Sequence, residues 1–172
     1  MGSVGAGTGA QAGGLKGGVG SASVTLSDGS TLAALVVVNA VGSPVIPHTG
    51  ELWGARHLLP GDLDGLGLPD GVELGRPNKE EVEQAVAAAR ANPTSAVPRT
   101  LATTIGVVAT DATLTKAQAA RLAGSGHDGM ARAINPIHTM YDGDTLFGLA
   151  TGKRDEPSAE AFHEMLLASG EW

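Results

Sequence analysis

The sequence predicts an α/β protein in which a sheet of small aliphatic residues is covered by alanine-rich helices. Only 3% of the 172 residues are aromatic, so the core must be built from valine, leucine, alanine and isoleucine. Runs of β-branched residues alternate with segments that have the spacing of amphipathic helices. The 26 glycines indicate that backbones pack closely. A chain of this length forms one ordinary domain.

The first 77 residues predict a glycine-rich start, a hairpin and a long irregular segment. Residues 1–20 are almost all glycine, alanine and small polar residues, which permits turns, a glycine-rich loop or a small-residue helix. Residues 19–26 and 31–41 are predicted strands, joined by the turn Ser27-Asp28-Gly29-Ser30. The next segment, residues 42–77, is rich in glycine and proline and is expected to be long and irregular, with His48, Trp53 and His57 along it.

The second half of the chain predicts three helices and two strands. Asn78 is placed to cap a helix over residues 79–91, and residues 92–100 form an exposed linker of the kind at which chains are cut. A strand over residues 103–109 and a helix from the cap Thr115 to about residue 134 follow. Leu122, Met130 and Ile134 are expected on the apolar side of that helix. A second strand is predicted over residues 142–149, and a last helix is predicted to begin at Ser158.

Composition excludes several classes of function. Eleven basic residues stand against 18 acidic ones, a net charge of -7, and no basic run is present, so nucleic acid is not an expected partner. The chain has no cysteine for disulfides or thiolate metal sites. Because no apolar stretch reaches the roughly 18 residues that span a bilayer, and no signal peptide is recognisable, we expect a cytoplasmic protein without a membrane partner.

Thr103 and Thr104 open the most informative segment. In one interpretation they are only the entry to a strand. In the other, cleavage of the bond between Ala102 and Thr103 creates a new amine on Thr103, which can take the proton from its own hydroxyl. The second interpretation makes Thr103 a nucleophile that the chain activates itself.

Asp142-Gly143-Asp144 is the second candidate for chemistry. Alternate residues of a strand share a face, so the two carboxylates can converge, and a close pair of carboxylates can hold or move a proton near neutrality. The pair can equally form an Asp-Gly turn before a strand. A divalent metal is a third interpretation, although no further ligand lies at a supporting spacing.

Four other features have a structural and a functional interpretation. Asn39 ends an apolar strand, where a carboxamide must find hydrogen-bond partners or can donate to a developing oxyanion. Lys16, the only charge among the first 27 residues, is either a solvated loop tip or a fixed charge at a site. His127, within the helix after Thr115, is expected to pack rather than to bind a ligand. Residues 5–9 suggest a phosphate loop, but a structural glycine turn is favoured because no strand precedes them.

Five ordered blocks together resemble one family, the self-cleaving L-aminopeptidase/D-esterase family, which includes β-peptidyl aminopeptidases and the 6-aminohexanoate-oligomer endohydrolase acting on nylon oligomers. The blocks are Gly2-Ser3-Val4-Gly5-Ala6-Gly7-Thr8-Gly9-Ala10, Lys16-Gly17-Gly18-Val19-Gly20-Ser21-Ala22-Ser23, Val38-Asn39-Ala40-Val41-Gly42, Thr103-Thr104-Ile105-Gly106-Val107-Val108-Ala109-Thr110-Asp111 and Asp142-Gly143-Asp144-Thr145-Leu146-Phe147. The double threonine with the downstream Asp-Gly-Asp is most similar to the nylon-oligomer branch.

The resemblance implies an N-terminal-nucleophile hydrolase of peptides or linear amides, with an αββα sandwich of mixed or antiparallel sheets. It implies self-cleavage between Ala102 and Thr103, which divides the single domain into a large-subunit part, residues 1–102, and a small-subunit part, residues 103–172. Thr103 is implied as the nucleophile, Asp142 and Asp144 as the carboxylates that orient it, Asn39 as the oxyanion donor and Lys16 as a charge near the site. No metal or cofactor is implied.

The chain differs from the family in two respects. Ala102 stands where members of the nearest branch carry asparagine, although attack on the preceding carbonyl needs strain and an oxyanion site more than a given side chain. The family's precursor is also about twice as long, so we expect a fragment that lacks an N-terminal half-sheet and leaves an apolar face exposed. A homo-oligomer of processed subunits and a non-catalytic fragment or assembly subunit are both consistent with this expectation.

Overall fold

A computed structural model of the chain describes residues 1–47, 49–58, 80, 84, 87 and 102–171. Its centre is a four-stranded sheet of order β3-β4-β5-β6, made of β3 (Gly18–Thr25), β4 (Thr31–Val38), β5 (Ile105–Thr110) and β6 (Thr145–Ala150). The pairs β3–β4 and β4–β5 are antiparallel, whereas β5 and β6 are parallel. The predicted α/β class with a mixed sheet is therefore confirmed.

The predicted hairpin is present. The strands β3 and β4 pair over their whole length, from Gly18 opposite Val38 to Thr25 opposite Thr31. The side chain of Asp28 accepts hydrogen bonds from the N–H and the hydroxyl of Ser30 within the turn, and Gly29 has a φ of 80°. A glycine suits this position because other residues are strained at positive φ.

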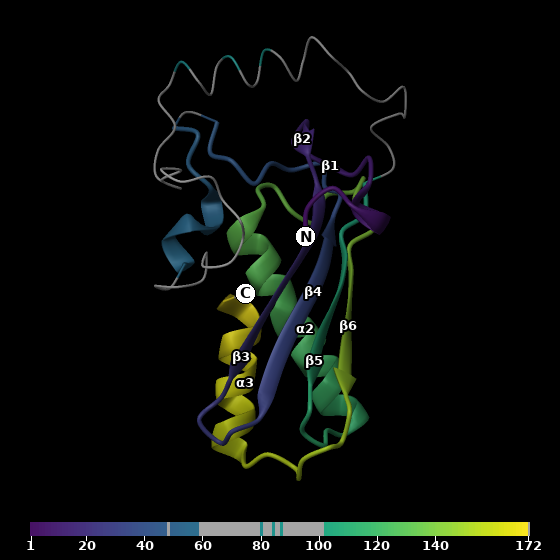
Figure 1. The fold of residues 1–172 in the computed structure, drawn as a ribbon, viewed down its shortest axis with the longest axis vertical. Coiled ribbons are helices and arrows are strands. Elements are labelled where there is room, and N and C mark those ends of the chain that lie inside the picture. The colour runs from purple at the N-terminus through teal and green to yellow at the C-terminus, as the bar shows by residue number, and fades with distance from the viewer. Residues whose placement is uncertain (48, 59–79, 81–83, 85–86, 88–101, 172) are drawn as a thin grey trace.

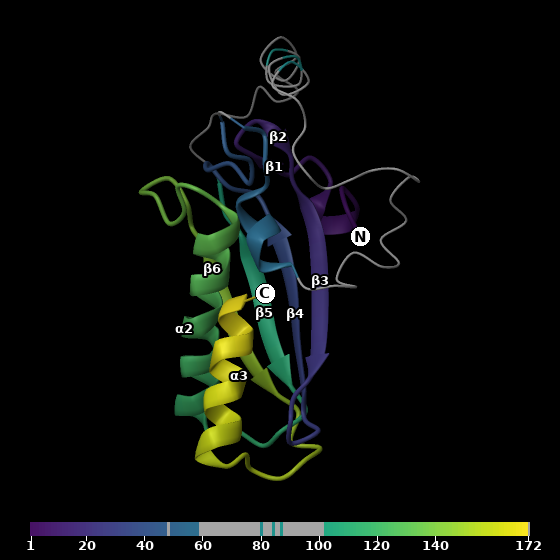
Figure 2. The same ribbon diagram turned by 90° about the vertical axis from the view of Figure 1, so that its left-hand side faces the viewer.

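Two helices, α2 (Lys116–Ala133) and α3 (Ala159–Glu171), cover one face of the sheet (Figure 1; Figure 2). Thr115 caps α2 as predicted, because its hydroxyl accepts the N–H of Gln118 while the Gln118 side chain accepts the Thr115 N–H. The close approach of α2 to β6 depends on Gly148, where a Cβ atom would lie 2.0 Å from the carbonyl oxygen of Ala119.

The main core lies between these helices and the sheet. The predicted apolar side of α2 is buried at Leu122, Met130 and Ile134. Leu122 and Met165 are fully enclosed between the layers, together with Leu26, Leu32, Val108 and Ala112. Small aliphatic residues thus form the core, as the composition predicted.

The opposite face of the sheet is apolar and exposed. Leu35, Ile105, Phe147 and Leu149 lie on it with 43–61% of their surface accessible. Cross-strand pairing places Leu35 beside Val107 and Val107 beside Phe147, so these side chains form one continuous band. In the described part of the chain, the four-stranded sheet therefore has a helical layer on one face and an exposed apolar surface on the other.

The glycine-rich start forms short elements at one end of the sheet. These are the 3-10 helix η1 (Gly5–Gly7), β1 (Gln11–Ala12) and β2 (Leu15–Lys16), which lead into β3. A phosphate loop would open an α-helix at this point, so the structural glycine turn is favoured. Further along, η2 (Trp53–His57) lies within the predicted irregular segment.

Other predictions fall outside the described residues. His48, most of the helix predicted over residues 79–91 and the linker over residues 92–100 are among them; Glu80, Gln84 and Ala87 are described and helical. No helix in the described ranges is both long and apolar enough to cross a membrane.

Candidate active site

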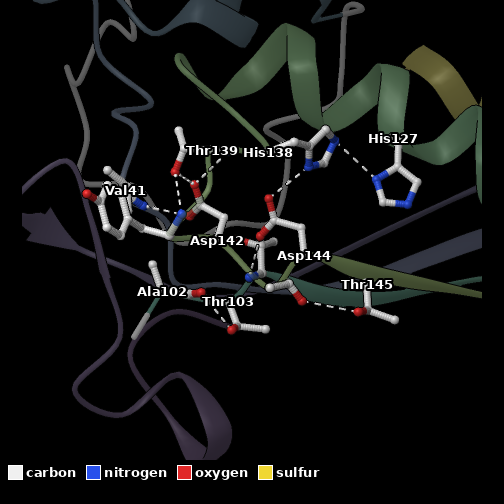
Figure 3. Close-up of polar contacts among 12 residues, drawn as sticks. Val41, Ala102, Thr103, His127, His138, Thr139, Asp142, Asp144 and Thr145 are labelled. Carbon is white, nitrogen blue, oxygen red and sulfur yellow. Dashed lines mark hydrogen bonds and ion pairs between the residues drawn. The ribbon is translucent and has the colours of Figure 1, made fainter. Parts of the chain in front are cut away.

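The candidate site lies at the end of the sheet where β4 ends and where β5 and β6 begin. Register brings Val37, Ile105 and Thr145 side by side across the three strands. The residues just beyond them, Asn39, Thr103 and Asp144, must therefore meet at this edge. Figure 3 shows polar contacts of Thr103, Asp142 and Asp144 with their neighbours.

Thr103 and Thr104 point in opposite directions because they alternate at the entry to β5. Thr103 is exposed, and its N–H donates to the carbonyl oxygen of Asn39 at 2.7 Å. Thr104 is fully buried, and its hydroxyl accepts the N–H of Asn39 at 3.3 Å. Of the two threonine hydroxyls, the one on Thr103 is accessible to a substrate.

The carbonyl oxygen of Ala102 is held by two donors. The Thr103 hydroxyl donates to it at 2.7 Å, and the Gly143 N–H donates to it at 2.9 Å. The second bond arises because Ala102 pairs with Asp142 in a parallel bridge ahead of β5 and β6. The Gly143 N–H polarises the carbonyl as an attack on it requires, and the Thr103 hydroxyl lies against the same carbonyl group.

Gly143 lies against the Thr103 side chain. A Cβ atom at position 143 would stand 2.9 Å from the Thr103 hydroxyl oxygen and 3.7 Å from its methyl carbon. The absence of a side chain at Gly143 therefore allows the hydroxyl to occupy its present position.

The two aspartates of the Asp-Gly-Asp motif have separate partners (Figure 3). Asp142 accepts the Val41 N–H at 3.0 Å and the N–H and hydroxyl of Thr139 at 3.0 and 2.5 Å. Burial raises the pKa of Asp142, but these hydrogen bonds and the nearby His138 outweigh burial and hold that pKa below its ordinary value. Asp142 thus ties the loop of residues 139–144 to the segment that follows β4.

Asp144 is almost completely buried, with 2% of its side chain accessible. One of its oxygens accepts the Thr104 N–H at 2.7 Å, and the other lies 2.8 Å from Nδ1 of His138. Its contacts therefore reach the backbone next to Thr103 rather than the Thr103 hydroxyl.

His138 continues this set of contacts to helix α2. Its Nε2 lies 3.1 Å from Nδ1 of His127, and the two rings meet edge to face at a centroid distance of 4.7 Å. Burial lowers the pKa of His127, assisted by the neighbouring His138 and opposed by Asp144 and Asp128. His127 was expected to pack within its helix, and its polar partner is this second histidine.

Asn39 and Lys16 lie around the same end of the sheet. The side-chain oxygen of Asn39 accepts the Gln11 N–H at 3.0 Å, which orients the carboxamide. Lys16 is exposed on β2 and pairs with Gln11 across the β1–β2 hairpin. The structure thus brings Ala102, Thr103 and Asn39 into direct contact and joins Asp144 to them through the Thr104 N–H. Lys16 is related to Asn39 through Gln11.

Sequence reasoning missed two residues of this site, Gly143 and His138. Gly143 was noted only as the spacer between two aspartates, and its backbone N–H is the group that binds Ala102. No motif in the sequence marks His138 as part of a site. Its backbone has a positive φ of 56°, and its ring reaches Asp144 from that conformation. Among the described residues, no group of three or more His, Asp or Glu side chains is arranged to hold a metal ion.

Comparison with known proteins identifies the family. The model of peptidase family S58 matches residues 1–169. An uncharacterized aminopeptidase of Mycobacterium leprae is 49% identical over 152 residues, which are 88% of this chain and 37% of that protein. An uncharacterized aminopeptidase of Mycobacterium tuberculosis is 47% identical over 152 residues, covering 88% of this chain and 40% of its own length.

Solved structures share the fold. A Burkholderia β-aminopeptidase superposes with a TM-score of 0.60 at 22% identity, over 99% of this chain and 43% of its own. An L-aminopeptidase D-Ala-esterase/amidase of Ochrobactrum anthropi, described as a variant of the Ntn hydrolase fold, gives a TM-score of 0.54 at 22% identity, over 99% and 42% of the two chains. The chain spans about two fifths of the length of these relatives. It belongs to peptidase family S58.

Proposed function

We propose that the protein is an amide-bond hydrolase whose nucleophile is the Thr103 hydroxyl, released by self-cleavage of the Ala102–Thr103 bond. The observation that carries this proposal is the Ala102 carbonyl, which accepts hydrogen bonds from the Thr103 hydroxyl and from the Gly143 N–H. The relatives named as aminopeptidases support the class of reaction.

Self-cleavage proceeds in two steps. The Thr103 oxygen attacks the carbonyl carbon of Ala102, its proton passes to the Thr103 nitrogen, and the carbon–nitrogen bond breaks to leave an ester between the two residues. Water then hydrolyses this ester, which leaves a carboxylate on Ala102 and a free amine beside the Thr103 hydroxyl. The Gly143 N–H stabilises the negative charge that develops on the carbonyl oxygen during the attack.

Turnover uses the same hydroxyl. The new Thr103 amine takes the hydroxyl proton, the oxygen attacks the substrate amide, and the proton leaves with the departing amine product. Water then releases the acyl group as an acid. In this proposal Asn39 donates its NH2 to the substrate oxyanion, Asp142 and Asp144 hold the loop and backbone around Thr103, and Lys16 supplies a positive charge.

The substrate class follows from the relatives and from the resemblance of the motifs. A β-aminopeptidase and an L-aminopeptidase D-Ala-esterase/amidase share the fold, which favours small peptides or amides. The Thr-Thr and Asp-Gly-Asp blocks favour linear amide oligomers such as those of 6-aminohexanoate. A panel of amino-acid p-nitroanilides, β-peptides and 6-aminohexanoate oligomers separates these substrates.

Residues 1–102 and 103–172 are, in this proposal, the parts of a large and a small subunit. The open apolar face of the sheet, with Leu35, Ile105 and Phe147, then packs against the second sheet of an αββα sandwich. Processed subunits assemble as a homo-oligomer, which light scattering of the purified protein measures.

The test compares Thr103→Ser with Thr103→Val by intact-mass analysis over several days. Serine keeps a hydroxyl nucleophile, whereas valine has nearly the same shape and no hydroxyl. We expect the parent and the serine variant to yield a fragment that begins at position 103, and the valine variant to stay whole. Cleavage of the valine variant, or an intact parent chain, contradicts the proposal.

A further inference from the structure

We propose that His138, supported by His127, is a positioning residue for Thr103 that acts through Asp144. The inference rests on the proposed role of Thr103 as the nucleophile. Its basis is one continuous set of contacts, from Nδ1 of His127 to Nε2 of His138, from Nδ1 of His138 to Asp144, and from Asp144 to the Thr104 N–H (Figure 3).

The Asp144 carboxylate depends on His138 for a hydrogen-bond donor to one of its oxygens. A carboxylate with 2% of its surface accessible has lost most of its hydration, so it needs hydrogen-bond donors for its charge. Among the described residues, the Thr104 N–H and the His138 ring meet this need, one on each oxygen. Removing the ring leaves one buried oxygen without a donor, and the carboxylate then loses its fixed orientation.

Asp144 in turn holds the backbone beside the nucleophile. The Thr104 N–H belongs to the peptide group that follows Thr103, so its bond to Asp144 fixes the backbone immediately after the nucleophile. The N–H before the nucleophile is fixed by the Asn39 carbonyl. With both sides held, the Thr103 hydroxyl can stay against the Ala102 carbonyl.

The tautomers of the His127 and His138 rings depend on each other. When His138 donates from Nδ1 to Asp144 and is neutral, its Nε2 accepts, and His127 is the donor. One extra proton can be shared between the rings, whereas two would place donor against donor at 3.1 Å. The charged groups that act on these rings are Asp128 on α2 and Asp142 and Asp144 on the loop. The neighbouring elements η2 and α3 also carry titratable groups, among them Arg56, His57, His163 and Glu164.

The backbone of His138 provides a matched pair of variants. Its φ of 56° lies in the left-handed region, which asparagine and glycine tolerate best. In His138→Asn the amide nitrogen takes the place of Nδ1 and can still donate to Asp144. In His138→Gly the donor is lost without added backbone strain. The two variants both lose the imidazole ring and its contact with His127, and they differ in whether a donor to Asp144 is present.

The first experiment uses NMR on the chain with Thr103→Ala, which keeps every sample intact. We expect the Thr104 amide shift to move in His138→Gly and to stay close to that of the Thr103→Ala parent in His138→Asn, where a donor to Asp144 is kept. In His138→Gly we expect hydrogen exchange of the Thr104 amide to accelerate roughly tenfold or more, relative to the Val108 amide as internal control. A Thr104 amide whose shift and exchange rate are unchanged in His138→Gly overturns the proposal.

The second experiment measures self-cleavage with Thr103 present. We expect His138→Gly to slow the cleavage roughly ten- to hundredfold, the effect of losing one hydrogen bond to a charged group, and His138→Asn to restore most of the rate. Equal rates in the two variants overturn the positioning role. If the parent itself does not cleave, the proposed function fails while the NMR result still decides whether His138 controls the Thr104 amide.

Discussion

Replacing Gly143 by alanine tests the geometry of the candidate site directly. The added Cβ atom would stand 2.9 Å from the Thr103 hydroxyl oxygen, and ordinary contact begins at 3.4 Å, so the hydroxyl must move by about half an ångström. Gly143 is not among the glycines of positive φ, so alanine fits the backbone and the fold is kept. The substitution therefore displaces the proposed nucleophile and little else.

The expected effect is on the rate of self-cleavage. A misplacement of about 1 Å lowers the rate of a well-oriented reaction by about 10²-fold, so half that displacement predicts a loss of roughly tenfold or more. The Gly143 N–H still donates to Ala102, because the backbone is unchanged. Intact-mass analysis gives the half-time of the Ala102–Thr103 bond, and thermal unfolding reports whether the fold is retained.

Gly124→Ala is the matched control. A Cβ atom at Gly124 meets nothing within 4 Å, and the position lies inside α2, so alanine should stabilise the helix by about 0.5–1 kcal/mol and leave cleavage unchanged. If Gly143→Ala cleaves as fast as the parent and Gly124→Ala, the hydroxyl position seen in the structure is not the one from which cleavage occurs.

Four further predictions concern stability and pH. Leu122→Ala should lower the free energy of unfolding by about 2–5 kcal/mol, measured in urea, because Leu122 is fully buried; a loss below 1 kcal/mol contradicts its place in the core. Thr115→Ala should remove about 1 kcal/mol by deleting the cap of α2, whereas Thr115→Ser should keep it. The pKa of Asp142 is lowered in the folded state, so Asp142 contributes fully to stability above the ordinary pKa of 3.8, and this contribution is lost as the pH falls below 3.8. Asp142→Asn should therefore flatten the dependence of unfolding free energy on acid pH, and an unchanged dependence refutes the assignment. The pKa of His127 is also lowered, but for a base this means that stability is complete above 6.5 and declines as pH falls below that value. His127→Phe should remove that decline in chemical denaturation between pH 7 and pH 5, and a persistent decline points to another histidine.

The sequence predicted the elements that are marked by strong local signals, such as turn and cap residues. The turn at Asp28 and Gly29 and the alternating strands around it specified the β3–β4 hairpin. Thr115 and Gln118 specified the start of α2, and the apolar spacing of Leu122 and Met130 specified its buried side. Each of these features depends on residues only a few positions apart, so the sequence contains the whole cause.

The sequence predicted which residues form the candidate site more completely than it predicted how those residues are placed. Thr103, Asn39 and Asp144 were named and lie together, because three neighbouring strands bring them to one edge of the sheet. Strand alternation suggested that Asp142 and Asp144 converge, yet β6 begins only at Thr145, and the preceding loop turns each carboxylate toward different partners. Side chains alternate between the two faces of a sheet, with a period of two residues, only within a strand.

What the sequence determined by itself is the family, the α/β class, the capped helix and the small-residue core, since these follow from motifs, periodicity and composition. Only the tertiary structure decided that the Gly143 N–H reaches the Ala102 carbonyl and that His138 binds Asp144. The Gly143–Ala102 contact joins residues 41 positions apart and forms only when β5 and β6 lie in parallel, whereas the His138–Asp144 contact lies within the loop before β6 and accompanies a left-handed backbone at His138. Local propensity carries no information about such a meeting, because the free energy that produces it comes from packing the whole sheet against its helices.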